Sequence, residues 1–412
     1  MAKKRKKATP ERVPTKHQLS KWQRQMRIRR IVIIAAVVFL AGILSYAGYG
    51  YYKDYKSDPL REVVIEVNDV PFTMEYYVKT LDAYTQGMES ESIYYMADYI
   101  GGMVADEIIN AELVRQGAEN LGIEVTPAEI DARLKEAGLP DDEAYRDIIR
   151  STLLQEKLEE HFGSNLTATM EQAHVQVMLV ESEEVAAEVI TRIDTGSNFT
   201  TLVEEFSCNS SIEGDLGWLP EELMPNTLIG DAAFNITPGE ISQPVYDETA
   251  TKDVGYWLIE VTDEEDNKIR ARAMLLGSEA EVEWVKAELV GRNFSSLAKE
   301  YSQHESNTKG GELDWLERGG MGSEAFDKVA FNITANVVSE PVKDESVQTT
   351  GGYWLVMIVD RGEHQLETDV REGLIDKHLN DWFEEWKENS TIENHLDANK
   401  KSWAVDRVLQ GR

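Results

Sequence analysis

Cysteine is nearly absent from this sequence, because Cys208 is the single cysteine among 412 residues. One cysteine cannot form an intramolecular disulfide or a multi-cysteine metal or iron–sulfur site, so packed cores must stabilise the fold. The sequence also lacks the HExxH, GxSxG, Walker and GxGxxG motifs, so nothing supports the enzyme classes that these motifs mark. We therefore expect no cofactor and no metal site.

Positive charge is scarce beyond the first 30 residues. Residues 1–30 hold 12 of the 42 Lys and Arg residues and a single acid, Glu11, so residues 31–412 carry a net charge of −44. A body this acidic repels phosphate groups. We therefore do not expect residues 31–412 to bind nucleic acid.

Charged side chains are also missing from residues 31–52, which form a continuous apolar segment. At about 1.5 Å per helical residue, this segment is long enough to span a hydrocarbon core of about 30 Å. The positive-inside rule then places residues 1–30, a basic tail, in the cytoplasm and the acidic body outside. The alternative is a cleaved signal peptide, but the segment exceeds a usual apolar h-region and ends in tyrosines instead of small residues.

The first part of the body, residues 62–170, has the pattern of a helical module. An apolar stripe with three- and four-residue spacing predicts a long helix from Ser92 whose apolar face needs a partner. A second helix is expected to begin at Thr126, with Pro127 at its first position and Glu129 completing a capping box. The stripe consists of Ile93, Met96, Ala97, Ile100, Val104, Ile108 and Ala111.

The last part, residues 364–412, is again helical in pattern. It has a broad apolar stripe and then a last short helix near Trp403 and Val408. Aromatic side chains on this stripe need a groove, so we expect the C-terminal helices to complete the 62–170 module. The stripe consists of Val370, Leu374, Leu379, Trp382, Phe383 and Trp386.

Between these helical parts the sequence repeats itself. NFTTLVEEFSCN, from Asn198, matches NFSSLAKEYSQH, from Asn293, and the segment from Leu216 to Val245 matches the one from Leu313 to Val342. Two tandem copies of one α+β domain are therefore expected, at 171–263 and 269–362. The acidic run TDEEDNK, Thr262 to Lys268, is expected to be a solvated linker between them.

The motifs GGELDWLERGGM, AFxxVAFNI, EPV and GYWLVMIV, in this order, resemble the parvulin (rotamase, PpiC-type) domain of peptidyl-prolyl isomerases. The flanking segments VNDVPFTMEYY and LGIEVTPAEID and the Trp-rich final helix resemble the chaperone module of the SurA and PrsA class of extracytoplasmic foldases. The resemblance implies an α+β chain: a transmembrane helix, a helical module formed by both ends of the body, and two parvulin-like domains inserted in it. It also implies a bacterial cell membrane location with a single membrane pass.

Isomerisation of an X–Pro bond needs an apolar pocket for the ring and polar groups that favour the twisted amide. The resemblance implies a pocket built from a Met and Phe positions, with Trp354 added in the second repeat and Trp257 in the first. The competing interpretation is that these side chains are ordinary core residues. The matching positions are Met321, Phe326 and Phe331 in the second repeat, and Met224, Ile229 and Phe234 in the first.

The polar positions of the family are changed in both repeats. Val177 and Ala273 stand where parvulins carry a histidine in the first strand, and Trp257 and Trp354 stand where they carry one in the last. His174 comes three residues early, and strand alternation turns it to the opposite face.

The third polar position, an Asp or Cys in the family, is held by Asn209 in the first repeat and His304 in the second. Cys208 is one residue away from it. His304 is therefore the candidate catalytic residue, and Cys208 is expected to be structural or a passive thiol.

Three functions remain open. The first is a membrane-anchored foldase or chaperone that binds unfolded or newly secreted polypeptides and has weak or absent isomerase activity. The second is an active isomerase centred on His304, and the third is a surface scaffold for one fixed partner. The sequence does not determine the oligomeric state or the clients.

Overall fold

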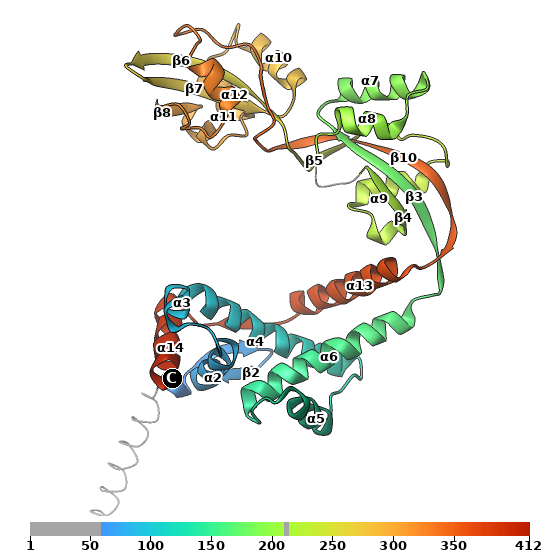
Figure 1. Ribbon diagram of the computed structural model, residues 1–412, viewed down its shortest axis with the longest axis vertical. Helices are drawn as coiled ribbons and strands as arrows, with labels where there is room; N and C mark the ends of the chain where they lie inside the picture. The colour runs from blue at the N-terminus through green and yellow to red at the C-terminus, as the bar shows by residue number, and fades with distance from the viewer. Residues whose placement is uncertain (1–58, 210–213) are drawn as a thin grey trace, which may run out of the picture. The chain divides into compact units, whose positions relative to one another are not determined.

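The computed structural model describes residues 59–209 and 214–412. These residues form two compact units: unit 1 holds the described residues up to Leu158 together with Asp381–Arg412, and unit 2 holds Glu159–Asn380 (Figure 1). The predicted basic tail and apolar span, residues 1–52, lie outside the described residues. None of the helices within 59–209 and 214–412 combines the length and apolar composition that crossing a bilayer requires.

Unit 1 contains a small sheet built from both ends of the body. Its strand order is β11-β1-β2, so β11 near the C-terminus pairs antiparallel with β1 near the N-terminus. Its elements are η1 (Pro59–Arg61), β1 (Val63–Val67), β2 (Val70–Thr73), α2 (Met74–Tyr84), α3 (Ser90–Tyr95), α4 (Ala97–Asn120), α5 (Pro127–Ala137), the first part of α6 (Glu143–Asn165), the end of α13 (Thr368–Glu388), β11 (Ile392–Asn394) and α14 (Ala398–Gly411).

The core of unit 1 explains why the apolar stripe of α4 needs a partner. Ile100, Val104 and Ile108 are buried in one cluster with Val405 and Val408 of α14, the last helix of the chain. The C-terminal partner of the stripe is thus α14, together with the end of α13. The aromatic residues Phe383 and Trp386 of α13 pack at the edge of this cluster.

One long helix from Ser92 was expected here, and this expectation is wrong. Helix α3 ends at Tyr95, α4 begins at Ala97, and Met96 between them has φ −104° and ψ 18°. Met96 is exposed. The capping box at Thr126 is confirmed, because its side chain accepts from Glu129 N and the Glu129 carboxylate accepts from Thr126 N.

Unit 2 contains two four-stranded sheets. The first repeat forms β3 (Thr169–Val180), α7 (Glu183–Asp194), α8 (Phe199–Phe206), β4 (Asp215–Leu219), η2 (Glu221–Leu223), α9 (Thr227–Asn235), β5 (Val245–Lys252) and β6 (Gly255–Glu265). The second repeat forms β7 (Lys268–Leu276), α10 (Glu279–Glu288), α11 (Phe294–Tyr301), η3 (Glu305–Lys309), β8 (Glu312–Leu316), α12 (Glu324–Ala330), β9 (Val342–Asp344) and β10 (Thr349–Gln365).

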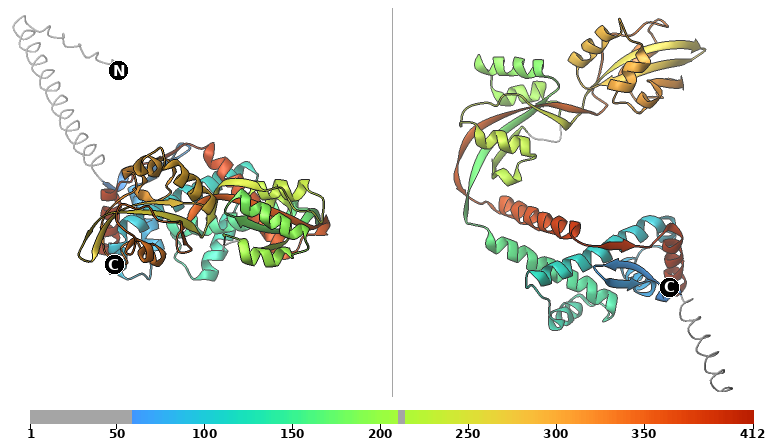
Figure 2. Two further views of the ribbon diagram at one scale, coloured as in Figure 1. Left: turned by 90° about the horizontal axis from the view of Figure 1, so that it is seen from above. Right: turned by 180° about the vertical axis from the view of Figure 1, so that it is seen from behind.

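The two repeats exchange their last strands. One sheet has the order β4-β3-β10-β5 and the other β8-β7-β6-β9. Strand β10, which ends the second repeat, therefore lies beside β3 of the first, and the right-hand view in Figure 2 shows this pair running together. We call the β4-β3-β10-β5 sheet with α7, α8 and α9 the first sheet domain, and the β8-β7-β6-β9 sheet with α10, α11 and α12 the second sheet domain.

The acidic run from Thr262 to Lys268 is largely exposed, as expected of a solvated connection, and it is part of a β-hairpin. Glu265 pairs with Lys268 across the turn, and Asp266 in the turn has φ +54°. Because β6 passes into β7 through this tight turn, the two strands are held in one sheet. The second sheet domain is thus inserted in the chain between β5 and β10 of the first.

Each sheet buries both faces against helices. In the first sheet domain, alternate residues of β3 separate into two cores: Val175, Val177 and Leu179 pack with α9, whereas Met178 and Val180 pack with α7 and α8 (Figure 1). The second sheet domain repeats this arrangement, with α12 on one face and α10 and α11 on the other. Such two-sided burial is why the segments Val177–Val180 of β3 and Ala273–Leu276 of β7 are continuously apolar.

Candidate functional site

Trp257 of β6 stands where the family carries a histidine, and its indole is fixed inside the second sheet domain. The side chain is 2% exposed, and Nε1 donates a hydrogen bond of 2.9 Å to Asp344 Oδ2. Ser323, which caps the N-terminus of α12, also donates to this carboxylate. The Trp257 ring lies 5.3 Å from the ring of Phe326 in an edge-to-face arrangement.

Trp354 of β10 makes the same contacts in the first sheet domain. It is 3% exposed, and Nε1 donates a 2.9 Å hydrogen bond to Asp247 Oδ2. Asn226, the N-cap of α9, lies 3.4 Å from the same oxygen. Both repeats have therefore replaced a family histidine by a tryptophan whose only hydrogen-bond donor is engaged by a carboxylate.

The two carboxylates remain ionised in the protein. Burial opposes the charge on Asp344, but hydrogen bonds from Ser323, Ser346 and Trp257 outweigh it and lower its pKa below 3.8. Burial likewise opposes the charge on Asp247, and donors that include Trp354 and Thr249 lower its pKa. Each carboxylate is thus a fixed acceptor that holds its tryptophan in place.

The strand exchange changes which predicted site residues lie together. Trp354 was expected beside Met321, Phe326 and Phe331, but it lies with Met224, Ile229 and Phe234. Trp257 instead joins the second-repeat set of Met321, Phe326 and Phe331. Each sheet domain thus takes its tryptophan from the other repeat, because the last strands are exchanged.

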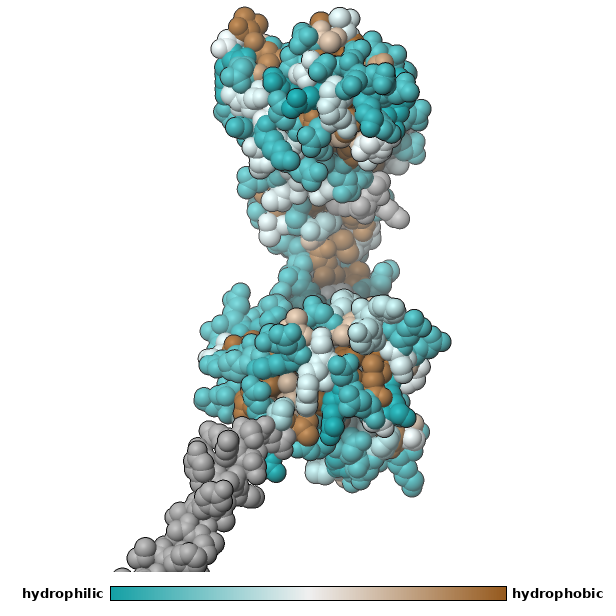
Figure 3. All heavy atoms as spheres, turned by 90° about the vertical axis from the view of Figure 1, so that its left-hand side faces the viewer, coloured by the Kyte–Doolittle hydropathy of each residue, from teal (hydrophilic) through white to brown (hydrophobic). Residues whose placement is uncertain are grey.

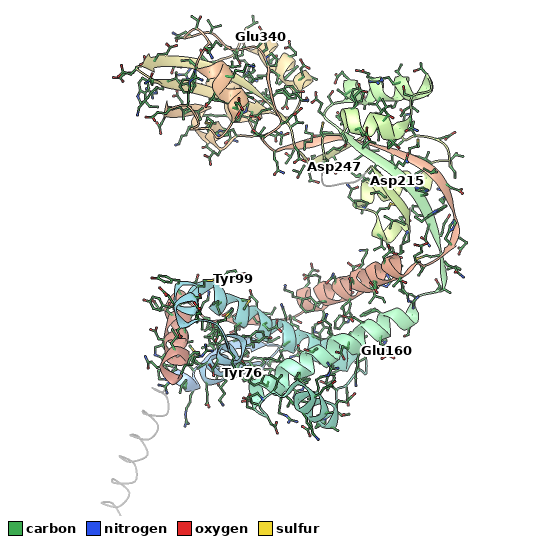
Figure 4. The ribbon with its side chains drawn as sticks, viewed as in Figure 1. Tyr76, Tyr99, Glu160, Asp215, Asp247 and Glu340 are labelled. Atoms are coloured by element: carbon green, nitrogen blue, oxygen red, sulfur yellow. The ribbon has the colours of Figure 1, made fainter. Side chains whose placement is uncertain are left out.

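Most of the predicted pocket residues are buried. Met224, Ile229 and Phe326 are covered, as are both tryptophans, whereas Met321, Phe331 and Phe234 keep part of their surface exposed. Figure 4 labels Asp247, the carboxylate that holds Trp354 in the first sheet domain. The apolar surface left for a ligand at the predicted pockets therefore comes from the three partly exposed residues.

His304, the candidate catalytic residue, caps the short helix η3. Its Nδ1 accepts a hydrogen bond from Ser306 N at 3.2 Å and lies 2.9 Å from Ser306 Oγ. Burial lowers the pKa of His304 below 6.5, against the influence of Glu305, so the ring is neutral at pH 7. Because Nδ1 accepts, the neutral ring carries its proton on Nε2. The ring lies 5.3 Å from that of Trp257.

The other polar candidates lie away from the tryptophan–carboxylate pairs. His174 is on the face of β3 opposite Val177, where its Nε2 lies 2.8 Å from Asp215 Oδ1. Asn209 donates to Thr251 O. Cys208 is half-buried, and burial raises the pKa of its thiol to about 11, so the thiol stays protonated.

Helices α3 and α4 carry an exposed aromatic surface that the sequence analysis missed. The side chains of Tyr95 and Tyr99 are 77% and 69% exposed, and Tyr99 and Met103 are four residues apart on one face of α4. Figure 4 labels Tyr99 at the surface of unit 1, and Figure 3 shows hydrophobic residues exposed among hydrophilic ones. We call this set the tyrosine surface; its members are Met88, Tyr94, Tyr95, Met96, Tyr99 and Met103.

The signal for this surface was present in the sequence. Tyr99 and Met103 follow a four-residue spacing beside the buried stripe, so they lie on a second face of α4. Exposed methionines are typical of surfaces that bind varied apolar partners. The apolar spacing by itself identified only the buried face.

Two family descriptions match the chain. One, a PPIC-type PPIASE domain (rotamase), matches residues 178–263 and again 258–360. The other, a SurA-like N-terminal domain, matches residues 24–147. Residues 258–263, which lie in the exchanged strand β6, belong to both rotamase matches.

The chain is also similar to curated proteins named Chaperone SurA and Foldase protein PrsA. A Chaperone SurA from Hahella chejuensis is 24% identical over 347 residues, covering 77% of this chain and 73% of the relative. A Foldase protein PrsA from Bacillus subtilis is 35% identical over 117 residues, covering 28% of this chain and 38% of the relative. A solved structure of PrsA from Bacillus cereus covers 85% of this chain and 92% of that chain, with 10% identity and a TM-score of 0.26.

These matches define a chain with a SurA-like N-terminal domain and two parvulin-type rotamase domains. In this combination of domains the chain is of the SurA/PrsA type of chaperones and foldases.

Proposed function

We propose that this protein is a membrane-anchored extracytoplasmic chaperone that binds unfolded secreted polypeptides and has little or no isomerase activity. The observation that carries the proposal is the replacement of the family histidines by tryptophans hydrogen-bonded to Asp344 and Asp247. These residues strengthen the packing of two cores and leave no indole N–H for a substrate amide. Polypeptide binding is thereby separated from proline isomerisation.

Weak catalysis follows from what a rotating amide needs. The barrier of about 20 kcal/mol falls when preorganised polar groups contact the twisted amide, and loss of one such group commonly costs about a hundredfold or more in rate. Val177 and Ala273 have no polar side-chain atom, and Trp257 and Trp354 are bonded to carboxylates. His304, whose ring lies 5.3 Å from that of Trp257, is the remaining polar candidate near one of the apolar sets.

Polypeptide binding is supported by the tyrosine surface. Tyrosine gives a large apolar contact area at a low entropy cost and keeps a hydroxyl for hydrogen bonds. Methionine adapts its shape to different partners. Together they suit contact with many unfolded segments of different sequence.

Anchoring is supported by the uncharged residues 31–52 after a basic tail. In intact cells, external protease should digest the body and leave the first 30 residues protected. Digestion of the tail with the body protected would reverse this orientation, and release of the intact body without detergent would exclude the anchor.

Two assays on residues 53–412 test the central proposal. This body should slow aggregation of several unrelated unfolded proteins, and Tyr95→Ser combined with Tyr99→Ser should remove much of that effect. Tyr246→Ser, at an exposed tyrosine of the first sheet domain, is the matched control. In the same preparation, X–Pro isomerisation of a short peptide should barely exceed the uncatalysed rate.

The alternatives give different results in the same assays. A robust isomerase rate that disappears in His304→Ala would support the active isomerase. Protection of one protein only, with no effect on the others, would support a scaffold for a fixed partner.

A further inference from the structure

We infer that the second sheet domain carries a binding site for an arginine side chain of an extended polypeptide, between the β6–β7 hairpin tip and Trp315. This inference rests on the proposed function, because it names a chemical feature of the bound polypeptide. A hollow of about 910 Å³ lies here. Its lining includes Glu264, Glu265, Asp266, Trp315 and Phe331.

The hollow is separate from the tryptophan–carboxylate pair. Its walls are the turn between β6 and β7 and the end of β8, and Phe331 is the member it shares with the predicted pocket set. Trp257 and Asp344 do not line it. Strand exchange pairs β6 with β7, and the acidic turn between these two strands forms one wall of the hollow.

The charges at the hollow favour a cation. Glu264, Glu265 and Asp266 are exposed, and within residues 59–209 and 214–412 none of them has an ion-pair partner. Glu317 is already paired, since its carboxylate lies 2.7 Å from Lys268 Nζ. The lining thus holds four acidic side chains against two basic ones, Lys268 and Arg318, so a positively charged side chain that enters here would meet a net negative charge.

Trp315 supplies a flat apolar face beside these charges. Its side chain is 41% exposed, and it has no ring partner among the described residues. A guanidinium group stacks well on an indole face, because the charge is attracted to the ring and the plane is only weakly hydrated. In the same hollow, Arg318 already lies 4.6 Å from the ring centroid of Phe331.

The first sheet domain contains the equivalent tryptophan with its face occupied. Trp218 lies opposite His174 on β3, as Trp315 lies opposite Arg270 on β7. The ring of His364, from the extension of β10, lies 3.8 Å from that of Trp218. In the second sheet domain the matching position of the exchanged strand is Asn267, which lines the hollow.

This internal comparison identifies the type of ligand. One domain covers its tryptophan with a planar nitrogen-containing ring of its own chain. The other leaves the equivalent tryptophan without a ring over it, in a hollow lined by four acidic and two basic side chains. The space over Trp315 therefore suits a planar, cationic side chain from another polypeptide, and arginine has this shape and charge.

The test uses the full chain in detergent micelles and two fluorescent peptides. The peptides are identical and extended, except that one has a central arginine and the other has citrulline, which keeps the shape and loses the charge. Fluorescence anisotropy gives the two dissociation constants. We expect about threefold to thirtyfold tighter binding of the arginine peptide, with a difference that shrinks as salt is added.

Two variants test the site independently. Trp315→Ala should remove most of the arginine preference, and the triple change Glu264→Gln, Glu265→Gln and Asp266→Asn should do the same at exposed positions. Trp284→Ala is the matched control, since Trp284 is 47% exposed on α10 of the same domain and does not line the hollow.

The possible results separate this inference from the proposed function. Equal binding of both peptides by the unmodified chain, a preference that persists in Trp315→Ala, or an equal loss in Trp284→Ala would overturn the arginine site alone. Failure to bind either peptide, together with failure to slow aggregation of any client, would overturn both.

Discussion

At the scale of single residues, two buried carboxylates hold a tryptophan in place in each parvulin-type domain. Asp344 and Asp247 each accept a hydrogen bond from a tryptophan that replaces a family histidine. Hydrogen bonds to a charged group contribute more than neutral ones. The former catalytic position therefore contributes to the stability of each core.

The first prediction concerns the size of that contribution. Asp344→Ala leaves the Trp257 N–H and the Ser323 hydroxyl without their acceptor inside the core, so unfolding should become easier by about 2 to 3 kcal/mol. Chemical denaturation followed by tryptophan fluorescence measures this change. Asp314→Ala, at an exposed aspartate of β8, should change the free energy of unfolding little. Equal effects of both substitutions would contradict the assigned role.

The second prediction concerns acid. The folded-state pKa of Asp344 lies below its usual 3.8, so its ionisation stabilises the fold at a pH above 3.8. That stabilisation is lost as the pH falls below 3.8 and through the folded-state pKa. Denaturation midpoints measured from pH 6 to pH 2 should therefore fall less steeply in Asp344→Asn than in the unmodified chain. An unchanged slope would exclude Asp344 as a source of acid sensitivity.

The sequence shows which residues of the two repeats are equivalent, but it does not show which tryptophan donates a hydrogen bond to which aspartate. Asp344 and Asp247 occupy equivalent places in the repeats, yet each tryptophan–carboxylate pair joins positions far apart in the chain. The partner of an indole N–H depends on strand pairing, and two nearly identical last strands leave that pairing open. The same uncertainty explains why Trp354 was placed with the wrong set.

At the scale of elements, the helical unit depends on close contact between α4 and the end of α13. A methyl group at Gly117 would lie 2.6 Å from Trp382 Cζ2, inside the distance that atoms tolerate. The small residue thus makes room for the indole. The broad apolar stripe on α13 predicted that its aromatic residues pack in a groove. The fully buried residues of this cluster from the C-terminal segment instead come from α14. Periodicity shows which face of a helix is apolar, but not how deeply that face is buried.

The third prediction is a double-mutant cycle at this contact. Gly117→Ala should destabilise unit 1 by about 1 to 3 kcal/mol, because the added methyl overpacks against Trp382. Gly117→Ala should cost less when Trp382→Ala is also present. Thermal unfolding of the single and double variants gives the coupling energy.

Gly102→Ala is the control within the same helix. Its nearest neighbour would be Lys401 Nζ at 3.8 Å, an ordinary contact, so alanine should stabilise α4 by up to about 1 kcal/mol. Additive effects of Gly117→Ala and Trp382→Ala would show that the two residues do not touch.

At the scale of the whole molecule, the exchanged strands make two repeats into two interdependent domains. Each last strand could in principle pair with the first strand of its own repeat, because the segments GYWLIEV and GYWLVMI are so similar. The tight hairpin at Asp266 favours the exchanged pairing of β6 with β7. The repeat boundaries can be predicted from the sequence. Which first strand each last strand pairs with depends on the geometry of the turn between the two copies, which the sequence repeat does not show.

The fourth prediction distinguishes the two pairings by disulfide formation. In a Cys208→Ser background, cysteine pairs at positions 260 and 272 or at 176 and 357 should crosslink, because Glu260 faces Arg272 and Gln176 faces Met357. Pairs at 176 and 260 or at 272 and 357 should not. Crosslinking of the second set alone would mean that each repeat closes on itself.

The exchange also has a consequence for the order of synthesis. A chain is made and exported from its N-terminus, so β3 emerges early, while its neighbour β10 is almost the last strand of the body. Every strand of the second sheet domain is complete by Asp344, before β10 begins at Thr349. The domain that is started second can therefore close first. The domain that is started first must wait with one edge of β3 unpaired until β10 has emerged.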